Sequence, residues 1–274
     1  MNPDTHTIVS TMNQTIATQS SGTPAVAAAR AQQTEDPIEA LARTVYTSTA
    51  LNNDFYDKWT RGRCAPKQIA VFARNYGEVV RAFPEILSVM ISNTRNVEAR
   101  TEYAKTLYSE MGYGRVDKVH SVLLDAWFEQ LGNKLGEPET LVWENMAANV
   151  AVLPETTGFI EGQRRLYSAD NATGSGAQLA QEWQAYTMLR KLYDGATQYK
   201  GLWELEDEFH EACEYFYAHI GAAEKEHKLE SLAGAQQFHV DGESKLRIES
   251  GFHEHLRLYG NFWTAVARAM NSME

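Results

Sequence analysis

From Asp36 onward, apolar residues recur three and four positions apart, which is the spacing of one face of an α-helix. Asp36 can cap a first helix, and Pro37 suits its first position. Glycine, proline and asparagine interrupt the pattern at several points, where we expect turns. The expected helices span 37–60, 66–92, 96–111, 115–132, 138–168, 176–194, 203–231 and 243–271. Because no segment alternates like a strand, the pattern predicts an all-α bundle of about seven to eight helices.

The first 36 residues have a different pattern. They are rich in Thr, Ser, Gln, Asn and Ala, and they contain no aromatic residue and no repeating apolar stripe. Such a segment has too little apolar surface to build a core. We therefore expect residues 1–36 to be a disordered or mobile tail and residues 37–274 to form a single helical domain.

Composition and charge exclude several classes of protein. The chain has 274 residues, of which 43% are hydrophobic, and 25 basic against 36 acidic residues give a net charge of -11. This charge repels phosphate backbones, so we expect no nucleic-acid partner. No apolar run is long enough to cross a bilayer and the start of the chain does not resemble a secretory signal, so a cytoplasmic protein without a membrane partner is expected. Cys64 and Cys213 are too few for a disulfide framework and lack zinc-finger spacing.

Titratable residues occupy positions where the helical period calls for an apolar side chain. Glu110 shares a face with Tyr103 in one expected helix, and His120 shares a face with Trp127 in the next. Burying a charge is costly unless a partner compensates for it. Both side chains are therefore candidates for a site inside the bundle.

Two later helices show the same feature. Glu182 lies about 60° from Leu179 around the helix and so falls within an apolar stripe. His227 projects onto another apolar face, with Glu224 three residues earlier, and di-iron carboxylate bundles use such a Glu-x-x-His pair as two ligands. His219 lies about 80° from His227 in a regular helix, and one looped-out residue, a π-bulge, would bring the two together.

Two readings of these inward residues stay open. As core residues, three carboxylates and three imidazoles would each need a separate hydrogen-bonding explanation, whereas two iron ions explain them together. Oxygen and nitrogen donors without thiolate suit iron or manganese. A ferritin-type bundle needs its two Glu/Asp-x-x-His motifs on different helices, but Asp207-x-x-His210 and Glu224-x-x-His227 lie in one expected helix. The hydrolase, Walker and His-Glu-x-x-His motifs are absent.

Two groups of residues resemble a known family. The opening of the heme-oxygenase-like proteins, which include thiaminase II and the pyrroloquinoline-quinone synthesis enzyme, resembles the segment 53–62 followed by Phe72, Tyr76 and Phe83-Pro84. The ligand order of the heme-oxygenase-like di-iron oxidases and oxygenases resembles the order Glu110, His120, Glu182, His219, Glu224 and His227. The resemblance covers roughly residues 45–271. The family motif His-x-x-x-Asp-x-x-His is altered here, because Glu224 replaces Asp and one extra residue follows His219.

The resemblance implies a heme-oxygenase-like bundle in which these six residues bind two Fe(II)/Fe(III) ions, with O2 as co-substrate. The implied activity is that of a non-heme di-iron oxidase or oxygenase. Its substrate would be a small molecule, namely an amino acid or an amino-acid-derived intermediate, which undergoes N-oxygenation, desaturation or C–C cleavage. An external electron donor would be compatible with this activity.

Several alternatives also stay open. They are a fatty-acid-decarboxylating di-iron oxidase, a metal-independent enzyme of cofactor metabolism, a metal-free helical interaction protein, and assembly as a homodimer. A heme oxygenase proper is disfavoured, because the first expected helix, 37–60, contains no histidine.

Arg190 is the candidate for substrate binding. It lies eight residues after Glu182 and within about 20° of the direction of Leu179, so helix geometry places it on the inward stripe. A guanidinium group can bind a carboxylate through two hydrogen bonds. The alternative is that Arg190 extends into solvent past Tyr186 and Tyr193.

Overall fold

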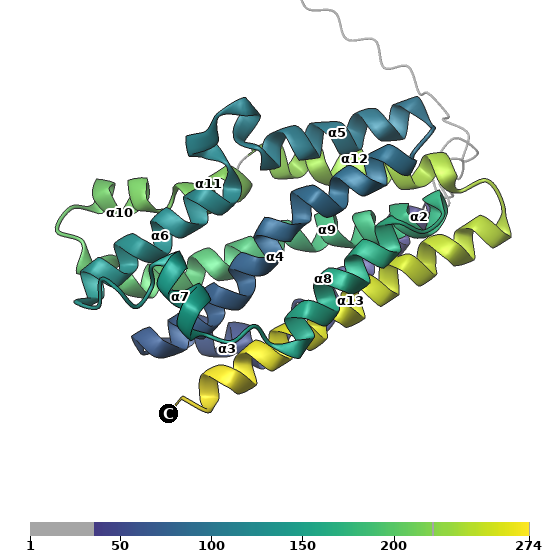
Figure 1. The fold of residues 1–274 in the computed structure, drawn as a ribbon. Helices are drawn as coiled ribbons and strands as arrows, with labels where there is room; N and C mark the ends of the chain where they lie inside the picture. The colour runs from purple at the N-terminus through teal and green to yellow at the C-terminus, as the bar shows by residue number, and fades with distance from the viewer. Residues whose placement is uncertain (1–35, 221, 274) are drawn as a thin grey trace, which may run out of the picture. The chain divides into compact units, whose positions relative to one another are not determined.

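The computed structural model describes residues 36–220 and 222–273, apart from the side chains of residues 222–226. These residues form twelve α-helices and four short 3-10 helices, and they contain no β-strand (Figure 1). The expected all-α class is confirmed, but the number of helices exceeds the seven to eight that the sequence predicted. The expected tail lies outside the described residues except for Asp36, which caps the first described helix through its side chain.

The helices of the first half of the domain are α2 (Pro37–Arg43), η1 (Thr44–Thr47), α3 (Asp54–Arg61), α4 (Pro66–Asn93), α5 (Val97–Glu110), η2 (Gly112–Gly114), η3 (Val116–Lys118) and α6 (His120–Leu135). Those of the second half are α7 (Trp143–Asn149), α8 (Pro154–Tyr167), α9 (Asn171–Ala196), η4 (Thr197–Leu202), α10 (Glu206–Ala212), α11 (Glu214–Ile220), α12 (Ala222–Phe238) and α13 (Gly242–Asn271).

Three helices that the sequence predicted as continuous are interrupted. The expected helix 37–60 is divided into α2, η1 and α3, and 138–168 is divided into α7 and α8, with Pro154 at the first position of α8. The expected helix 203–231 is divided into α10, α11 and α12. The successive short helices keep their apolar faces toward one interior. The helical spacing of apolar residues therefore continues across the breaks, which is why the sequence predicted single helices. The sequence also allowed for a π-bulge between His219 and His227. The structure instead divides this segment into α11 and α12, and residue 221 between them lies outside the described residues.

The opposite error occurs at α9, which begins at Asn171 although a break was expected over 171–176. A Cβ atom at Gly176 would lie 2.0 Å from the carbonyl oxygen of Ile248, and one at Gly251 would lie 2.0 Å from that of Thr173. These glycines therefore let the backbones of α9 and α13 touch. Gly176, which the sequence placed at the end of an expected break, therefore serves the packing of two helices instead.

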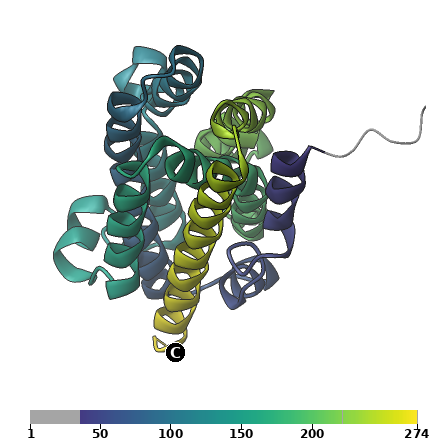
Figure 2. The same ribbon diagram turned by 90° about the vertical axis from the view of Figure 1, so that its right-hand side faces the viewer.

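The long helices α4, α9 and α13 hold the bundle together. α9 packs against both α13 and α12, while α8 packs against both α4 and α13. Figure 1 shows α5 beside α12, and Figure 2 shows α13 running past α8. The segment with α10, α11 and α12 thus returns along the bundle and meets α5, α6 and α9.

A group of stacked rings fills one part of the interior, and we call it the aromatic cluster: Phe55, Trp59, Phe72 and Trp263. Phe55 is fully buried, and its ring centre lies 4.8 Å from that of Phe72 and 4.4 Å from that of Trp263. Offset and tilted ring contacts of this kind add to the stabilisation from apolar burial. The aromatic cluster joins α3, α4 and α13.

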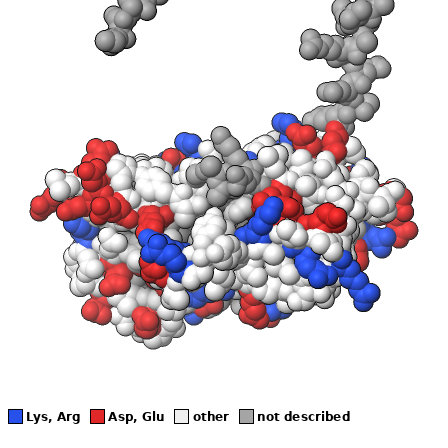
Figure 3. All heavy atoms as spheres, turned by 90° about the horizontal axis from the view of Figure 1, so that it is seen from above, with Lys and Arg blue, Asp and Glu red and all other residues white. Residues whose placement is uncertain are grey.

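On the surface, acidic side chains gather at the end of the domain where α10 lies (Figure 3). The first turn of α10 contains Glu206, Asp207 and Glu208, whose charges interact favourably with the positive end of the helix dipole. Among the described residues, no helix is both long and apolar enough to span a bilayer.

Candidate metal centre

Five titratable side chains meet in the interior, each from a different helix. We call them the polar cluster: Glu110 of α5, His120 of α6, Glu182 of α9, His219 of α11 and His227 of α12. All five are buried, with at most 9% of their surface exposed. The structure thus brings together five of the six side chains that the sequence predicted as ligands.

Three of them form a compact group. One ligand atom each from Glu110, His120 and His219 lie within 4.8 Å of one another. The Nδ1 atom of His120 is 2.8 Å from Oε2 of Glu110, and the ring centres of His120 and His219 are 4.1 Å apart. This spacing would let a single cation contact all three residues.

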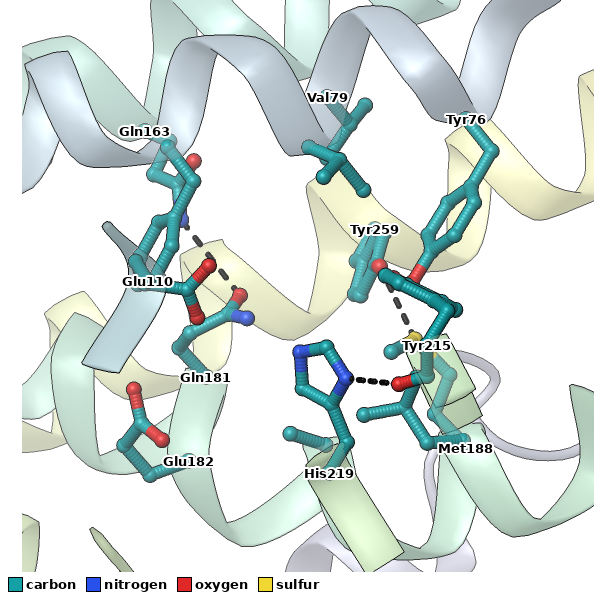
Figure 4. Close-up of a pocket in the computed structure, with 14 residues that line it drawn as sticks. Tyr76, Val79, Glu110, Gln163, Gln181, Glu182, Met188, Tyr215, His219 and Tyr259 are labelled. Atoms are coloured by element: carbon teal, nitrogen blue, oxygen red, sulfur yellow. Dashed lines mark hydrogen bonds between the residues drawn. The ribbon is translucent and has the colours of Figure 1, made fainter. Parts of the chain in front are cut away.

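Glu182 and His227 form a neighbouring pair. Oε2 of Glu182 lies 3.9 Å from Nδ1 of His227. Figure 4 shows that Glu110, Glu182 and His219 approach one common space from different helices. The pair and the compact group therefore belong to one site.

The local sequence explains how Glu110 and His120 meet. Glu110 is the last residue of α5 and His120 is the first residue of α6, so the chain must reverse between them. It does so through Gly112 and Tyr113, whose φ angles are 63° and 55°. A Cβ atom at Gly112 would lie 2.4 Å from the carbonyl carbon of Lys118, so only glycine fits this turn.

Hydrogen bonds from outside the polar cluster orient two of its members. His219 donates from Nδ1 to the carbonyl oxygen of Tyr215, at 2.7 Å, which leaves its Nε2 atom for the site. Glu182 accepts a 2.7 Å hydrogen bond from the amide of Gln178, and Gln178 in turn accepts one from the hydroxyl of Tyr167. Such contacts commonly hold metal ligands in place.

Burial shifts the protonation of these groups. Burial, reinforced by the nearby Glu110 carboxylate, raises the pKa of Glu182 to about 8. Burial, reinforced by His120, lowers the pKa of His219 to about 3. Burial also acts to raise the pKa of Glu110, but His120, together with His219 and His227, outweighs it and lowers that pKa. Burial acts to lower the pKa of His120, but the adjacent Glu110 carboxylate outweighs it and raises that pKa. A bound cation would favour the ionised form of Glu182 and the neutral form of His120, and the oxygen and nitrogen donors of this cluster suit iron.

A cavity of about 50 Å³ adjoins the polar cluster, with Glu110, Glu182 and His219 in its wall (Figure 4). The rest of the wall combines apolar side chains with the uncharged polar side chains of Tyr76, Gln163, Gln181, Tyr215 and Tyr259. The hydroxyls of Tyr76 and Tyr215 lie 2.7 Å apart. No Lys or Arg side chain is among the described residues that line this cavity.

Two predicted site residues are not part of this arrangement. Glu224 lies in α12, but its side chain is outside the described residues. Arg190 is exposed, with its guanidinium against Tyr186. Its expected inward position is wrong, because the side chain leaves the stripe along the ring of Tyr186. Contact between Arg190 and a substrate carboxylate stays a prediction.

Gln178 and Tyr215 support the polar cluster, but the sequence did not lead us to predict them. Gln178 stands four residues before Glu182, and Tyr215 stands four residues before His219. Residues four apart share a helix face, so this spacing was the signal that could have identified them.

Comparison with known proteins places the chain in a class. The family of iron-containing redox enzymes matches residues 70–260, which is more than half of the chain. The chain therefore belongs to this family and is an oxidoreductase.

Particular relatives can also be named. A 4-aminobenzoate synthase of Chlamydia trachomatis is 26% identical over 225 residues, which are 81% of this chain and 89% of that protein. A CADD-like protein of unknown function from Nostoc punctiforme superposes with a TM-score of 0.65 at 15% identity, over 84% of this chain and 95% of that one. A TenA homologue from Pseudomonas syringae gives a TM-score of 0.64 at 13% identity, over 84% and 92% of the two chains. These structural likenesses confirm the heme-oxygenase-like fold.

Proposed function

We propose that this chain is a non-heme di-iron enzyme that uses dioxygen to oxidise or oxygenate a small organic molecule. The observation that carries the proposal is the polar cluster, five buried donor side chains beside a cavity, in a chain of an iron-containing redox family. Its five members would hold the iron ions, and Glu224 is the sixth ligand by its place in the sequence.

The side chains around the site have defined tasks in this proposal. Bound iron would supply the redox chemistry that amino-acid side chains lack. The carbonyl of Tyr215 fixes the ring of His219, and the amide of Gln178 fixes the carboxylate of Glu182. The aliphatic part of the cavity wall, which includes Val79 and Leu189, limits the access of water. The chain thus orients the ligands and keeps the reacting groups dry.

The substrate class rests on the relatives. The name 4-aminobenzoate synthase describes the formation of a small aromatic amino acid by those proteins. For this chain we propose an amino acid or an amino-acid-derived intermediate of biosynthesis as the substrate, with N-oxygenation, desaturation or C–C cleavage as the outcome. An external donor would provide the electrons that the substrate does not. No specific observation favours the fatty-acid or the metal-independent alternative.

The first test is the iron content. After anaerobic loading with Fe(II), we expect about two irons per chain, because three carboxylates and three imidazoles match the ligand number of a di-iron centre. Metal analysis and Mössbauer spectroscopy measure this number. A fully loaded preparation with a single iron, or with zinc alone, would contradict the di-iron assignment.

The second test identifies the substrate. The Fe(II)-loaded enzyme is mixed with oxygenated buffer in a stopped-flow spectrometer, across a panel of amino acids, aromatic amines and fatty acids. We expect visible absorption whose formation depends on one class of compound. The same panel with the His227→Ala variant serves as the control, and equal signals from both proteins would contradict the proposal.

A further inference from the structure

Just outside the polar cluster, Lys228 of α12 is surrounded by aromatic rings. Its Nζ atom lies 5.4 Å from the ring centre of Tyr46, 5.5 Å from that of Trp183 and 5.3 Å from that of Tyr186. We call these three residues the aromatic cage. An ammonium group within about 6 Å of a ring centre is attracted by the ring's electron density. The side chain of Lys228 is therefore held from three sides.

Hydrogen bonds reinforce the aromatic cage. The ammonium of Lys228 donates to the hydroxyl of Tyr46 at 3.0 Å. The indole N–H of Trp183 donates to the main-chain carbonyl of Lys228 at 3.2 Å. Trp183 thus contacts both the backbone and the side chain of Lys228, and it is itself 8% exposed. A half-shielded contact of this kind fixes a helix turn more firmly than an exposed ion pair.

The position of this contact is informative. Trp183 follows Glu182 in α9, and Lys228 follows His227 in α12. Successive residues on a helix point in different directions, so Glu182 and His227 face the site while Trp183 and Lys228 meet outside it. The same two helical turns are therefore joined twice, once at the polar cluster and once at the aromatic cage.

The third side of the aromatic cage comes from the start of the domain. Tyr46 belongs to η1, which directly follows α2. α2 packs against α12, and the amide of Gln236 in α12 donates to the carboxylate of Asp36 at 2.8 Å. The segment 36–47 therefore contacts α12 at two separated points, Gln236 and Lys228.

We propose that Lys228 is a positioning residue, which holds His227 in register with Glu182 so that α12 can contribute its ligand to the iron centre. The inference rests on the proposed function and adds a residue outside the polar cluster. α11 ends at Ile220, so His219 and His227 belong to different helices. A separate contact is therefore needed to position His227. The placement of His219 therefore does not by itself determine the placement of His227.

The Lys228→Met substitution tests this role, because it removes the ammonium and keeps the length of the side chain. We expect one of the two irons to bind about 10- to 100-fold more weakly, as is typical when support for a metal ligand is lost. The other iron should be retained, because Glu110, His120 and His219 are untouched. Anaerobic Fe(II) titration against a competing chelator measures both affinities, and Mössbauer spectra show which iron is lost. The midpoint of thermal unfolding of the metal-free protein should fall by less than about 4 °C.

Two variants serve as controls. Lys228→Arg keeps a cation that can stack on aromatic rings, so we expect iron affinities within about threefold of the wild type. Lys134→Met removes a similar contact, in which Nζ lies 5.7 Å from the ring centre of Trp203, near the end of α6 opposite to His120. It should bind iron like the wild type. Should Lys228→Met not fold, Tyr46→Phe removes only the hydroxyl bonded to Lys228 and should weaken the same iron by about fivefold.

The outcomes separate this inference from the proposed function. A wild-type chain that takes up no iron overturns both. A wild type with two irons and a Lys228→Met variant of equal affinity overturns the positioning role alone. Equal losses in Lys228→Met and Lys134→Met, or in Lys228→Met and Lys228→Arg, also overturn it, because the effect would then not depend on the caged cation.

Discussion

The aromatic cluster and the polar cluster are both buried, but their burial has opposite consequences. The aromatic cluster contains large apolar rings, and removing them from water stabilises the fold. The polar cluster contains carboxylates and imidazoles, and burial disfavours their charged forms, as the raised pKa of Glu182 shows. The first region therefore supports the structure, whereas the second has a cost in stability that the proposed iron site would explain.

One residue connects the two regions. Tyr76 of α4 stacks on Phe72 at 5.7 Å and lies 5.6 Å from Trp263, both in the aromatic cluster. Its hydroxyl meets that of Tyr215, whose carbonyl orients His219. The rigid apolar packing thus reaches the wall of the cavity and limits the motion of a proposed ligand.

The largest expected effect comes from substitutions in the polar cluster. Glu182→Ala, His219→Ala and His227→Ala should each abolish turnover and lower the iron content, while the far-ultraviolet circular dichroism stays that of a helical protein. The free energy of unfolding of the metal-free protein should fall by about 1–3 kcal/mol, because each change removes a buried titratable group but leaves a buried hydrogen-bond partner unpaired, such as Gln178 beside Glu182. His253→Ala, at an exposed site on α13, is the control and should keep full activity. If the three variants unfold and the wild type binds no metal, the polar cluster is a hydrogen-bonded core network and not an iron site.

The next largest effect comes from a substitution in the aromatic cluster. Phe55→Ala should lower the free energy of unfolding by about 3–5 kcal/mol, because it leaves a cavity between Phe72 and Trp263. Denaturation by urea measures the loss. The molecules that remain folded should still bind iron, since Phe55 does not touch the polar cluster. Leu246→Ala, at a residue that is 66% exposed, should cost less than about 0.5 kcal/mol. Similar losses in the two variants would erase the difference between core and surface on which the comparison depends.

The two regions also differ in how well the sequence predicted them. The inward positions of Glu110, His120, Glu182 and His227 follow from the helical period, which is a local property of each segment. Spacing within helices does not say which helices become neighbours. The convergence of these residues was therefore inferred from their shared ligand chemistry, which two iron ions would explain together, and from a family resemblance. Their role as ligands stays a prediction.

Other features could not be predicted because they depend on distant contacts. Gly176 was placed at the edge of an expected break between helices, but its role is set by Ile248, which is 72 positions further along the chain. Arg190 was placed inward by its angle around α9, yet a long side chain can leave that direction and lie along Tyr186. The angle around the helix predicts the direction of Glu182 better, because its side chain is shorter than that of Arg190.

The smallest expected effect concerns His255, a buried polar residue that belongs to neither cluster. His255 of α13 is fully buried, with its ring 5.5 Å from that of Phe159 and 6.0 Å from that of Tyr259. Among the described residues, neither of its ring nitrogens has a hydrogen-bond partner. Burial lowers the pKa of His255 to about 3. The polar cluster can be compensated by a cation, whereas His255 is expected to affect stability alone.

The sign of the pH effect follows from the two pKa values of His255. The unfolded chain binds a proton near pH 6.5 and the folded chain near pH 3, so below pH 6.5 the unfolded state holds more protons. This group therefore costs no stability above about pH 6.5 and lowers the free energy of unfolding by about 1.4 kcal/mol per pH unit as the pH falls toward 3. His255→Leu removes the titrating group, so between pH 7 and pH 5 the variant should lose about 2 kcal/mol less than the wild type. Urea denaturation at the two pH values measures the difference, and His253→Leu, at an exposed site on the same helix, should behave like the wild type. An equal loss in the His255→Leu variant and the wild type would show that the folded protein admits a proton to His255, and the apolar character assigned to its surroundings would then be wrong.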